Sequence, residues 1–126
     1  MKAKQVIVWR HDLKVRLGKK KAQAGHAALM SLSNKIRESL QPDTVRLTPV
    51  EQAWFLGNFR KIVLLVDSED ELMEIYEKAQ AAGLNVDLVT DSGLTEFNGV
   101  PTRTCLAIGP DLDEKINQVT GHLRPA

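Results

Sequence analysis

The chain contains 126 residues, of which 43% are hydrophobic and 26% are charged. This length and balance predict a single domain, residues 1–126, that buries a core without needing a disulfide or a metal. The only cysteine, Cys105, excludes an internal disulfide framework and favours a reducing compartment. The longest apolar run, residues 62–66, is far shorter than the roughly 20 residues of a membrane span, and the N-terminus has no cleavage-site pattern. We therefore expect a cytoplasmic protein with no membrane partner.

The net charge of +1 hides a division along the chain. Residues 1–46 hold eleven basic against three acidic side chains, whereas residues 47–126 hold six against thirteen. The basic segment can present a positive surface to a polyanion, although most charge runs are solvated helix ends and loops. Besides Lys19, its candidate binding residues are Arg10, Lys14, Arg16, Lys20 and Lys21.

The first two predicted elements are a strand over residues 5–9 and a long amphipathic helix from Lys19 to about Ser39. The strand is a short apolar run rich in β-branched side chains. The stripe predicted to be buried on the helix carries apolar residues at helical spacing, with His26 among them. The apolar members are Ala22, Leu29, Ile36 and Leu40.

Capping boxes, in which a side-chain oxygen stands three residues before a Glu, predict three later helices. These boxes begin at Thr48, Ser68 and Asp111, and Gly83 is placed to end the second helix. Further strands are predicted over residues 61–66, 85–90 and 104–109.

Four strands among four helices predict an α/β layered sandwich with a mixed sheet. Helical connections favour parallel neighbours, and the long loop between the third and fourth strands permits an antiparallel pair. Sites in such folds gather beyond the carboxyl ends of parallel strands. The first strand leads into the basic segment and the third into Asp91, so parallel orientation brings both to one edge.

Lys19, Gln23 and His26 are spaced to share one face of the long helix. We expect Lys19 at the mouth of a site and His26 about 10 Å along the helix axis, near the sheet. The alternative is a solvated lysine and a half-buried structural histidine. Asp91, which precedes Ser-Gly, can equally be a turn residue without a further role. Cys105 lies in a strand pattern typical of an inert buried thiol.

Several other sites are excluded by the sequence. Gly18-Lys19-Lys20 lacks the earlier glycine and the Ser or Thr of a phosphate-binding loop. The three histidines have no metal-ligand spacing, and only one cysteine could join them. A Gly-x-Ser-x-Gly nucleophile elbow is missing as well.

Short motifs along nearly the whole chain, in order and at consistent spacing, resemble one family. In the first half they are Lys4–Lys14, Gly18-Lys19, Ala22-Gln23 and His26-Ala27-Ala28. In the second half they are Lys61–Leu64, Glu69–Leu72, Ala82–Leu84, Asp91–Glu96, Thr102–Thr104, Leu106–Pro110 and Val119–Gly121. The combination resembles the archaeal and eukaryotic type of peptidyl-tRNA hydrolase.

This resemblance implies a three-layer α/β/α sandwich around a four-stranded mixed sheet, a homodimer, and no cofactor or metal. It implies hydrolysis of the ester that joins a peptide to the terminal ribose of tRNA. The site residues it implies are Lys19, Gln23 and His26 on the first helix and Asp91, Thr95 and Thr104 on the other side of the site.

The mechanism expected from this set begins with Asp91, which orients or activates water. Lys19, expected on the opposite wall, stabilises the negative charge that develops on the ester carbonyl. The threonine hydroxyls hold water or substrate, and Gln23 and His26 orient these groups or the terminal adenosine. A lysine beside an aspartate could also exchange roles with it as the base.

The chain departs from the family pattern at a few positions. Arg16-Leu17 replaces a Gly-Lys pair, Lys21 replaces a common Ala, and Leu94 stands where an Arg is frequent. These departures motivate a second hypothesis, a catalytically inactive tRNA- or RNA-binding module with the same fold. A third is an esterase for another acyl substrate.

One apolar group in the sequence suits either a core or a dimer interface. It consists of Trp54, Phe55, Leu56 and Phe59.

Overall fold

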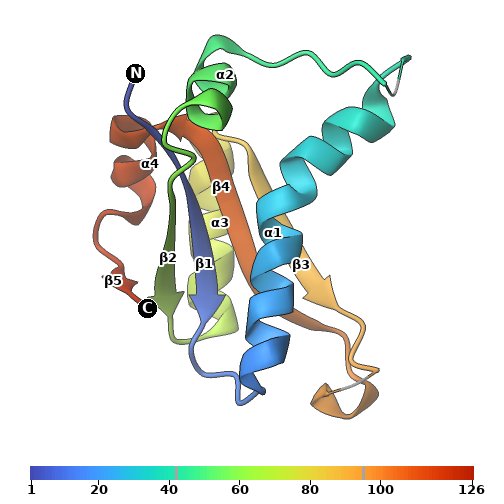
Figure 1. Cartoon of the computed structure of the whole chain (residues 1–126). Helices are drawn as coiled ribbons and strands as arrows, with labels where there is room; N and C mark the ends of the chain where they lie inside the picture. Colours follow the sequence, from blue (N-terminus) through green and yellow to red (C-terminus); the bar gives the residue numbers. More distant parts are fainter. Residues whose placement is uncertain (42, 95) are drawn as a thin grey trace.

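The computed structural model describes residues 1–41, 43–94 and 96–126. In these ranges one sheet has the strand order β3-β4-β1-β2-β5 (Figure 1). The strands are β1 (Ala3–Arg10), β2 (Lys61–Val66), β3 (Val86–Asp91), β4 (Thr102–Leu112) and β5 (Arg124–Pro125). The expectation of four strands is therefore wrong by one. The two residues of β5 include a proline and are too few to show any periodicity in sequence.

The helices lie on both faces of the sheet, with α1 on one face and α3 and α4 on the other (Figure 1). They are α1 (Leu17–Glu38), α2 (Pro49–Leu56), α3 (Glu69–Ala81) and α4 (Asp113–Thr120), with a short 3-10 turn, η1 (Phe97–Gly99). This arrangement confirms the α/β layered sandwich. None of these helices is both long and apolar enough to cross a membrane.

A separate apolar core fills each side of the sheet. The larger core lies between the sheet and the α3/α4 layer, with Leu72, Leu106 and Ile116 completely buried. The smaller core lies beneath α1 and joins Trp9, Ala27 and other small or β-branched residues. Alternate residues of β1 serve the two cores, because successive side chains of a strand point to opposite faces.

The sheet is mixed, as predicted. β1 pairs parallel with β2, and β4 pairs antiparallel with both β1 and β3. Consequently β1, β2 and β3 run in one direction and end at the same edge, at Arg10, Val66 and Asp91. The basic segment after β1 and the carboxylate of Asp91 thus share this edge, which confirms the expectation drawn from strand order.

Of the three predicted capping boxes, the one at Thr48 forms completely and the one at Ser68 forms in part. The Thr48 hydroxyl accepts from the Glu51 backbone N–H, and the Glu51 carboxylate accepts from the Thr48 N–H. The Ser68 hydroxyl accepts from the Glu71 N–H, although the Glu71 carboxylate accepts from the N–H of Asp67 instead of Ser68. Both contacts satisfy backbone donors that a helix leaves unpaired at its start.

The third box, at Asp111, does not form. Asp111 still lies in β4, opposite Lys4 of β1, and its carboxylate accepts from the N–H of Leu112. α4 begins only at Asp113, without a side-chain cap. Sheet pairing to β1 extends the strand past the residue that local sequence marks as a helix start.

The buried stripe predicted for α1 is wrong, because its large apolar residues face outward. Leu29 is 63% exposed and Leu40, beyond the helix end, is fully exposed. Ile36 and Ala22 are exposed as well. The residues that face the sheet are Gln23 and Ala27, with other alanines beside them. Small side chains let the helix approach the strands closely, so apolar size is a poor guide to the buried face here.

Candidate active site

Lys19 and Asp91 meet where the start of α1 lies over the end of β3. The Lys19 Nζ atom is 2.7 Å from Asp91 Oδ1, and the two side chains are 17% and 8% exposed. The expectation that they stand on opposite walls is therefore wrong. The close approach of α1 to the sheet brings the ammonium directly onto the carboxylate.

Two further donors hold the Asp91 carboxylate. Gln23 Nε2 donates to Oδ1 at 3.2 Å, and the Gly93 N–H donates to Oδ2 at 2.8 Å. The hydrogen bond from Lys19 is the largest cause that lowers the pKa of Asp91 below its ordinary value, against the opposing effect of burial. Asp91 is accordingly a carboxylate throughout the neutral pH range.

Gly93 is required by the turn after β3. Its φ of +83° lies in the region that favours glycine, and a Cβ atom here would come within 2.4 Å of the Val100 carbonyl oxygen. Because its N–H also binds Asp91, the Asp-Ser-Gly segment is both a tight turn and part of the site. The turn interpretation and the functional interpretation of Asp91 therefore do not exclude each other.

Within the described part of the chain, Thr104 is linked to Asp91 through Gln23. Its Oγ1 donates to Gln23 Oε1 at 2.8 Å, and Thr104 itself is completely buried. The Asp91 carboxylate can only accept a hydrogen bond, so the NH₂ group of the Gln23 amide must point toward it. The amide oxygen of Gln23 then points toward Thr104 and accepts from its hydroxyl. The three side chains form one chain of hydrogen bonds from β4 through α1 to β3.

His26 is placed differently from the expectation. It lies on the flank of α1 that carries Lys19, two turns along, but it is exposed and does not approach the sheet. The stripe that does approach the sheet is that of Gln23 and Ala27. Thr95, the remaining residue of the predicted set, lies outside the described residues.

The predicted basic binding residues surround the start of α1. Arg10 is largely committed to the fold, since its side chain is 12% exposed and its guanidinium donates to Asp12 and to the Arg103 carbonyl. Lys14 and Arg16 are exposed and border a shallow hollow. The remaining two, Lys20 and Lys21, lie on the other flank of the helix.

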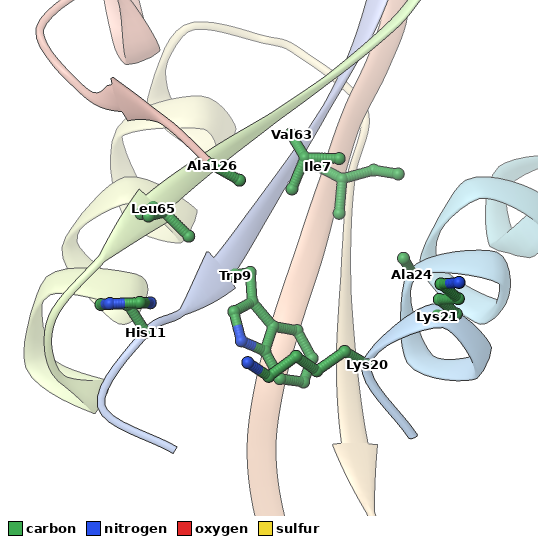
Figure 2. A pocket seen from close by; sticks show the side chains of 9 residues that line it. All are labelled: Ile7, Trp9, His11, Lys20, Lys21, Ala24, Val63, Leu65 and Ala126. Carbon is green, nitrogen blue, oxygen red and sulfur yellow. The ribbon is translucent and has the colours of Figure 1, made fainter. Parts of the chain in front are cut away.

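That other flank borders an apolar hollow of about 380 Å³, which sequence reasoning did not find. Figure 2 shows the β1 and β2 side chains that form it, Ile7, Trp9, Val63 and Leu65, with Lys20 and Lys21 from α1 beside them. The continuous apolar run of β2, which places apolar side chains on both faces of the sheet, was a signal for this face. The sequence could not say which of the two faces the helices cover.

The environment of Cys105 agrees with the sequence analysis. Cys105 is completely buried, and burial raises the pKa of its thiol to about 11, so it is inert at neutral pH. Among the described residues, no group of three or more His, Cys, Asp or Glu side chains could hold a metal ion.

Comparisons with known proteins agree with one another. The family model described as Peptidyl-tRNA hydrolase PTH2 matches residues 3–126. A peptidyl-tRNA hydrolase of Methanothermobacter thermautotrophicus is 42% identical, over 96% of this chain and 97% of the relative. The corresponding protein of Methanopyrus kandleri is 43% identical over 95% of each chain.

A solved structure shares the fold at low sequence identity. It is a protein of unknown function from Agrobacterium, with a TM-score of 0.63 and 10% identity. The match covers 100% of this chain and 98% of the other. At this identity the likeness concerns the fold alone.

The contact between Lys19 and Asp91 predicts a measurable titration. In Lys19→Met the pKa of Asp91 should rise, because the largest lowering cause is removed while burial remains. A group whose pKa is lowered on folding stabilises the fold above its unfolded pKa of about 3.9 and loses this contribution as pH falls through the folded value. The free energy of unfolding of Lys19→Met should therefore fall less than that of the parent as pH drops from the unfolded pKa of Asp91 through its folded pKa.

Carbon NMR of the Asp91 carboxyl group measures the shift directly. Lys20→Met is the matched control, since this neighbouring lysine borders the hollow on the other flank of α1. An equal pKa of Asp91 in the parent and Lys19→Met would contradict the assignment of the contact.

Proposed function

The chain belongs to the peptidyl-tRNA hydrolase PTH2 family, and we propose that it hydrolyses the peptidyl-tRNA ester through the paired side chains of Lys19 and Asp91. The products are free tRNA and the peptide. The observation that carries the assignment of residues is the ionic contact at 2.7 Å, shielded from solvent and placed at the sheet edge beside the basic segment. Since this substrate arises during translation, we expect the protein in the cytoplasm.

Lys19 is proposed to stabilise the transition state. Attack of water on the ester carbonyl carbon places negative charge on the carbonyl oxygen. The bond from that carbon to the ribose oxygen then breaks, and the ribose oxygen takes the proton that the attacking water gives up. The ammonium carries three N–H donors, so it can bind Asp91 and the carbonyl oxygen together. A cation fixed in a partly dry site lowers the energy of such an oxyanion without reorganising during the reaction.

Asp91 is proposed to hold Lys19 and orient the attacking water. Its lowered pKa keeps it ionised but makes it a weak base at neutral pH, so orientation is its stronger contribution. Gln23 and Thr104 are positioning residues, because their hydrogen bonds end on the carboxylate and Thr104 has no exposed surface. His26 and Thr95 remain proposed contributors on the resemblance to the family.

The tRNA part of the substrate is proposed to bind the basic residues around the start of α1. Lys14, Arg16 and Lys21 are exposed there, and Lys20 is half-buried beside them. Residues 1–46 hold the large positive excess of the chain, which suits a phosphate backbone. Arg10 contributes chiefly by fixing the loop that follows β1, given its bonds to Asp12 and Arg103.

A homodimer is the second part of the proposal. Trp54 is core, whereas Leu56 is 87% and Phe59 47% exposed. Lys61 Nζ lies 3.2 Å from the Phe59 ring centroid, and Val63, two residues along β2, is 38% exposed beside the apolar hollow. We name Leu56, Phe59 and Val63 the α2–β2 face and propose that a second copy covers it.

Loss of the Asp91 charge should lower turnover by roughly a hundredfold or more in Asp91→Asn. Lys19→Ala should cause a comparable loss, and the double variant should lose little more than either, because the two side chains act as one unit. Release of free tRNA by the purified protein is the measurement. Asp87→Asn is the matched control, as this carboxylate lies on the same strand and accepts only from Asn34 and Asn85 among the contacts described.

Burial raises the pKa of Asp87, so a neutral side chain is tolerated there and turnover should stay within about threefold of the parent. Near-normal turnover in Asp91→Asn would reduce Asp91 to a turn residue and reject the mechanism. Binding without turnover in the parent protein would favour the inactive RNA-binding module, and turnover of simple esters alone would favour another esterase.

Binding of tRNA should weaken steeply as salt is added, because each neutralised phosphate releases counterions. Lys20→Ala and Lys21→Ala should lower both the affinity and the slope of affinity against salt, whereas Lys115→Ala on α4 should leave the slope unchanged. Filter binding across a salt series gives both quantities. An affinity for tRNA that does not change with salt concentration would contradict the proposed role of the basic segment.

The α2–β2 face should determine the oligomeric state. Phe59→Glu should convert a dimer into monomers, since a buried unpaired charge is costly at an apolar interface. Sedimentation of the parent and the variant measures this, with Leu40→Glu as a control at a fully exposed apolar residue outside the face. A parent that sediments as a monomer at high concentration would reject the dimer.

A further inference from the structure

The outer edge of β3 is open, in contrast to that of β2. Within the described ranges β3 pairs with β4 alone, whereas β2 is bordered by β5 and by the Ala126 N–H, which donates to the Val63 carbonyl. Figure 1 shows β3 as the outermost strand on its side of the sheet. A row of unpaired N–H and C=O groups at such an edge is a template for an added strand.

The backbone groups that face this edge can be identified. The Gly109 N–H donates to the Asn85 carbonyl at 2.9 Å, so this opposed pair is a hydrogen-bonded one. Pairs alternate along an antiparallel ladder, and Val86 and Leu88 therefore stand in non-bonded positions opposite Ile108 and Leu106. Their N–H and C=O groups point away from β4, to the open edge.

The open edge leads straight to the proposed site. β3 ends at Asp91, which holds Lys19, three residues beyond Leu88. We propose that the peptide arm of the substrate binds as an added strand along Val86–Asp91, parallel to β3, with its ester at Asp91. The direction follows from chemistry, because the ester is at the carboxyl end of the peptide. This inference rests on the proposed function.

Backbone pairing suits a substrate whose peptide sequence varies. Hydrogen bonds between main chains supply affinity without reading side chains, as in other cases of strand addition. Side chains of the added strand would meet the flank of α1, where His26 and Leu29 are exposed. His26 lies two turns along the helix in line with Lys19, so it borders the path toward the ester.

The length of the contact can be estimated from strand geometry. At about 3.3 Å per residue, Leu88 lies roughly 10 Å before Asp91. Amide groups about two to five residues before the ester should therefore be bound, and additional residues should add little. A single N-acetylated aminoacyl group should gain almost nothing from the edge.

The decisive probe is a tRNA esterified with a five-residue peptide, compared with the same substrate carrying one N-methyl group at each amide in turn. Only every second N–H of a strand faces its neighbour. We expect kcat/KM to fall about tenfold at alternate positions and to change less than twofold at the positions between. If N-methylation lowers kcat/KM equally at every amide, or at none of them, the proposal is overturned.

A variant of the chain tests the same edge. Leu88→Pro removes the outward N–H but no bond to β4, whereas Leu88→Ala removes the same side-chain packing and keeps the N–H. The preference for the five-residue substrate over the N-acetylaminoacyl one should fall at least fivefold more in the proline variant than in the alanine variant. Equal preferences would overturn the proposal, and the N-methyl series on the parent protein decides it even if the proline variant does not fold.

The two proposals fail in different ways. Hydrolysis of the N-acetylaminoacyl substrate with no alternation along the longer peptide rejects strand addition and keeps the proposed activity. No hydrolysis of any substrate rejects the activity, and strand addition with it.

Discussion

The close packing of α1 on the sheet is the constraint on which the site depends. Ala27 is completely buried against the sheet and Gln23 nearly so. The same approach brings Lys19 to 2.7 Å from Asp91 and Gln23 between Asp91 and Thr104. A bulkier residue at position 27 would lift the helix and lengthen all three contacts, so the small residue here serves the proposed chemistry as well as the core.

The helix also separates two surfaces with different chemistry. One flank carries Lys19, which contacts Asp91 of β3, and the other carries Lys20 and Lys21 beside the apolar hollow (Figure 2). Consecutive lysines diverge because each helical residue is turned by about 100° from the last. One short basic sequence can therefore supply both a group for the reaction and groups for phosphate binding.

Sequence reasoning found the helices, the longer strands, the mixed sheet and the shared edge, because capping residues and β-branched runs are local signals. It missed what depends on tertiary packing. Leu29 and Ile36 gave the stronger amphipathic pattern, yet the buried face of α1 is made of alanines and Gln23. Asp111 has the form of a helix cap but is held in β4 by its pairing with Lys4. The distance between Lys19 and Asp91 was likewise beyond any spacing rule, since it is set by how deeply the helix packs.

An open edge strand can pair with the edge of another chain, and two features of β3 reduce this risk although its edge stays open. β3 has only six residues, and Asp87 places a carboxylate within the strand, two features that discourage edge-to-edge pairing between copies. On the opposite side of the sheet, the two residues of β5 pair with β2. A strand as short as β5 is enough to pair with β2, whereas among the described residues no such strand pairs with the outer edge of β3, which ends at Asp91. Strand addition by the peptide gives that difference a function, since a permanent cover on β3 would occupy the path by which a peptide of any sequence reaches Lys19 and Asp91.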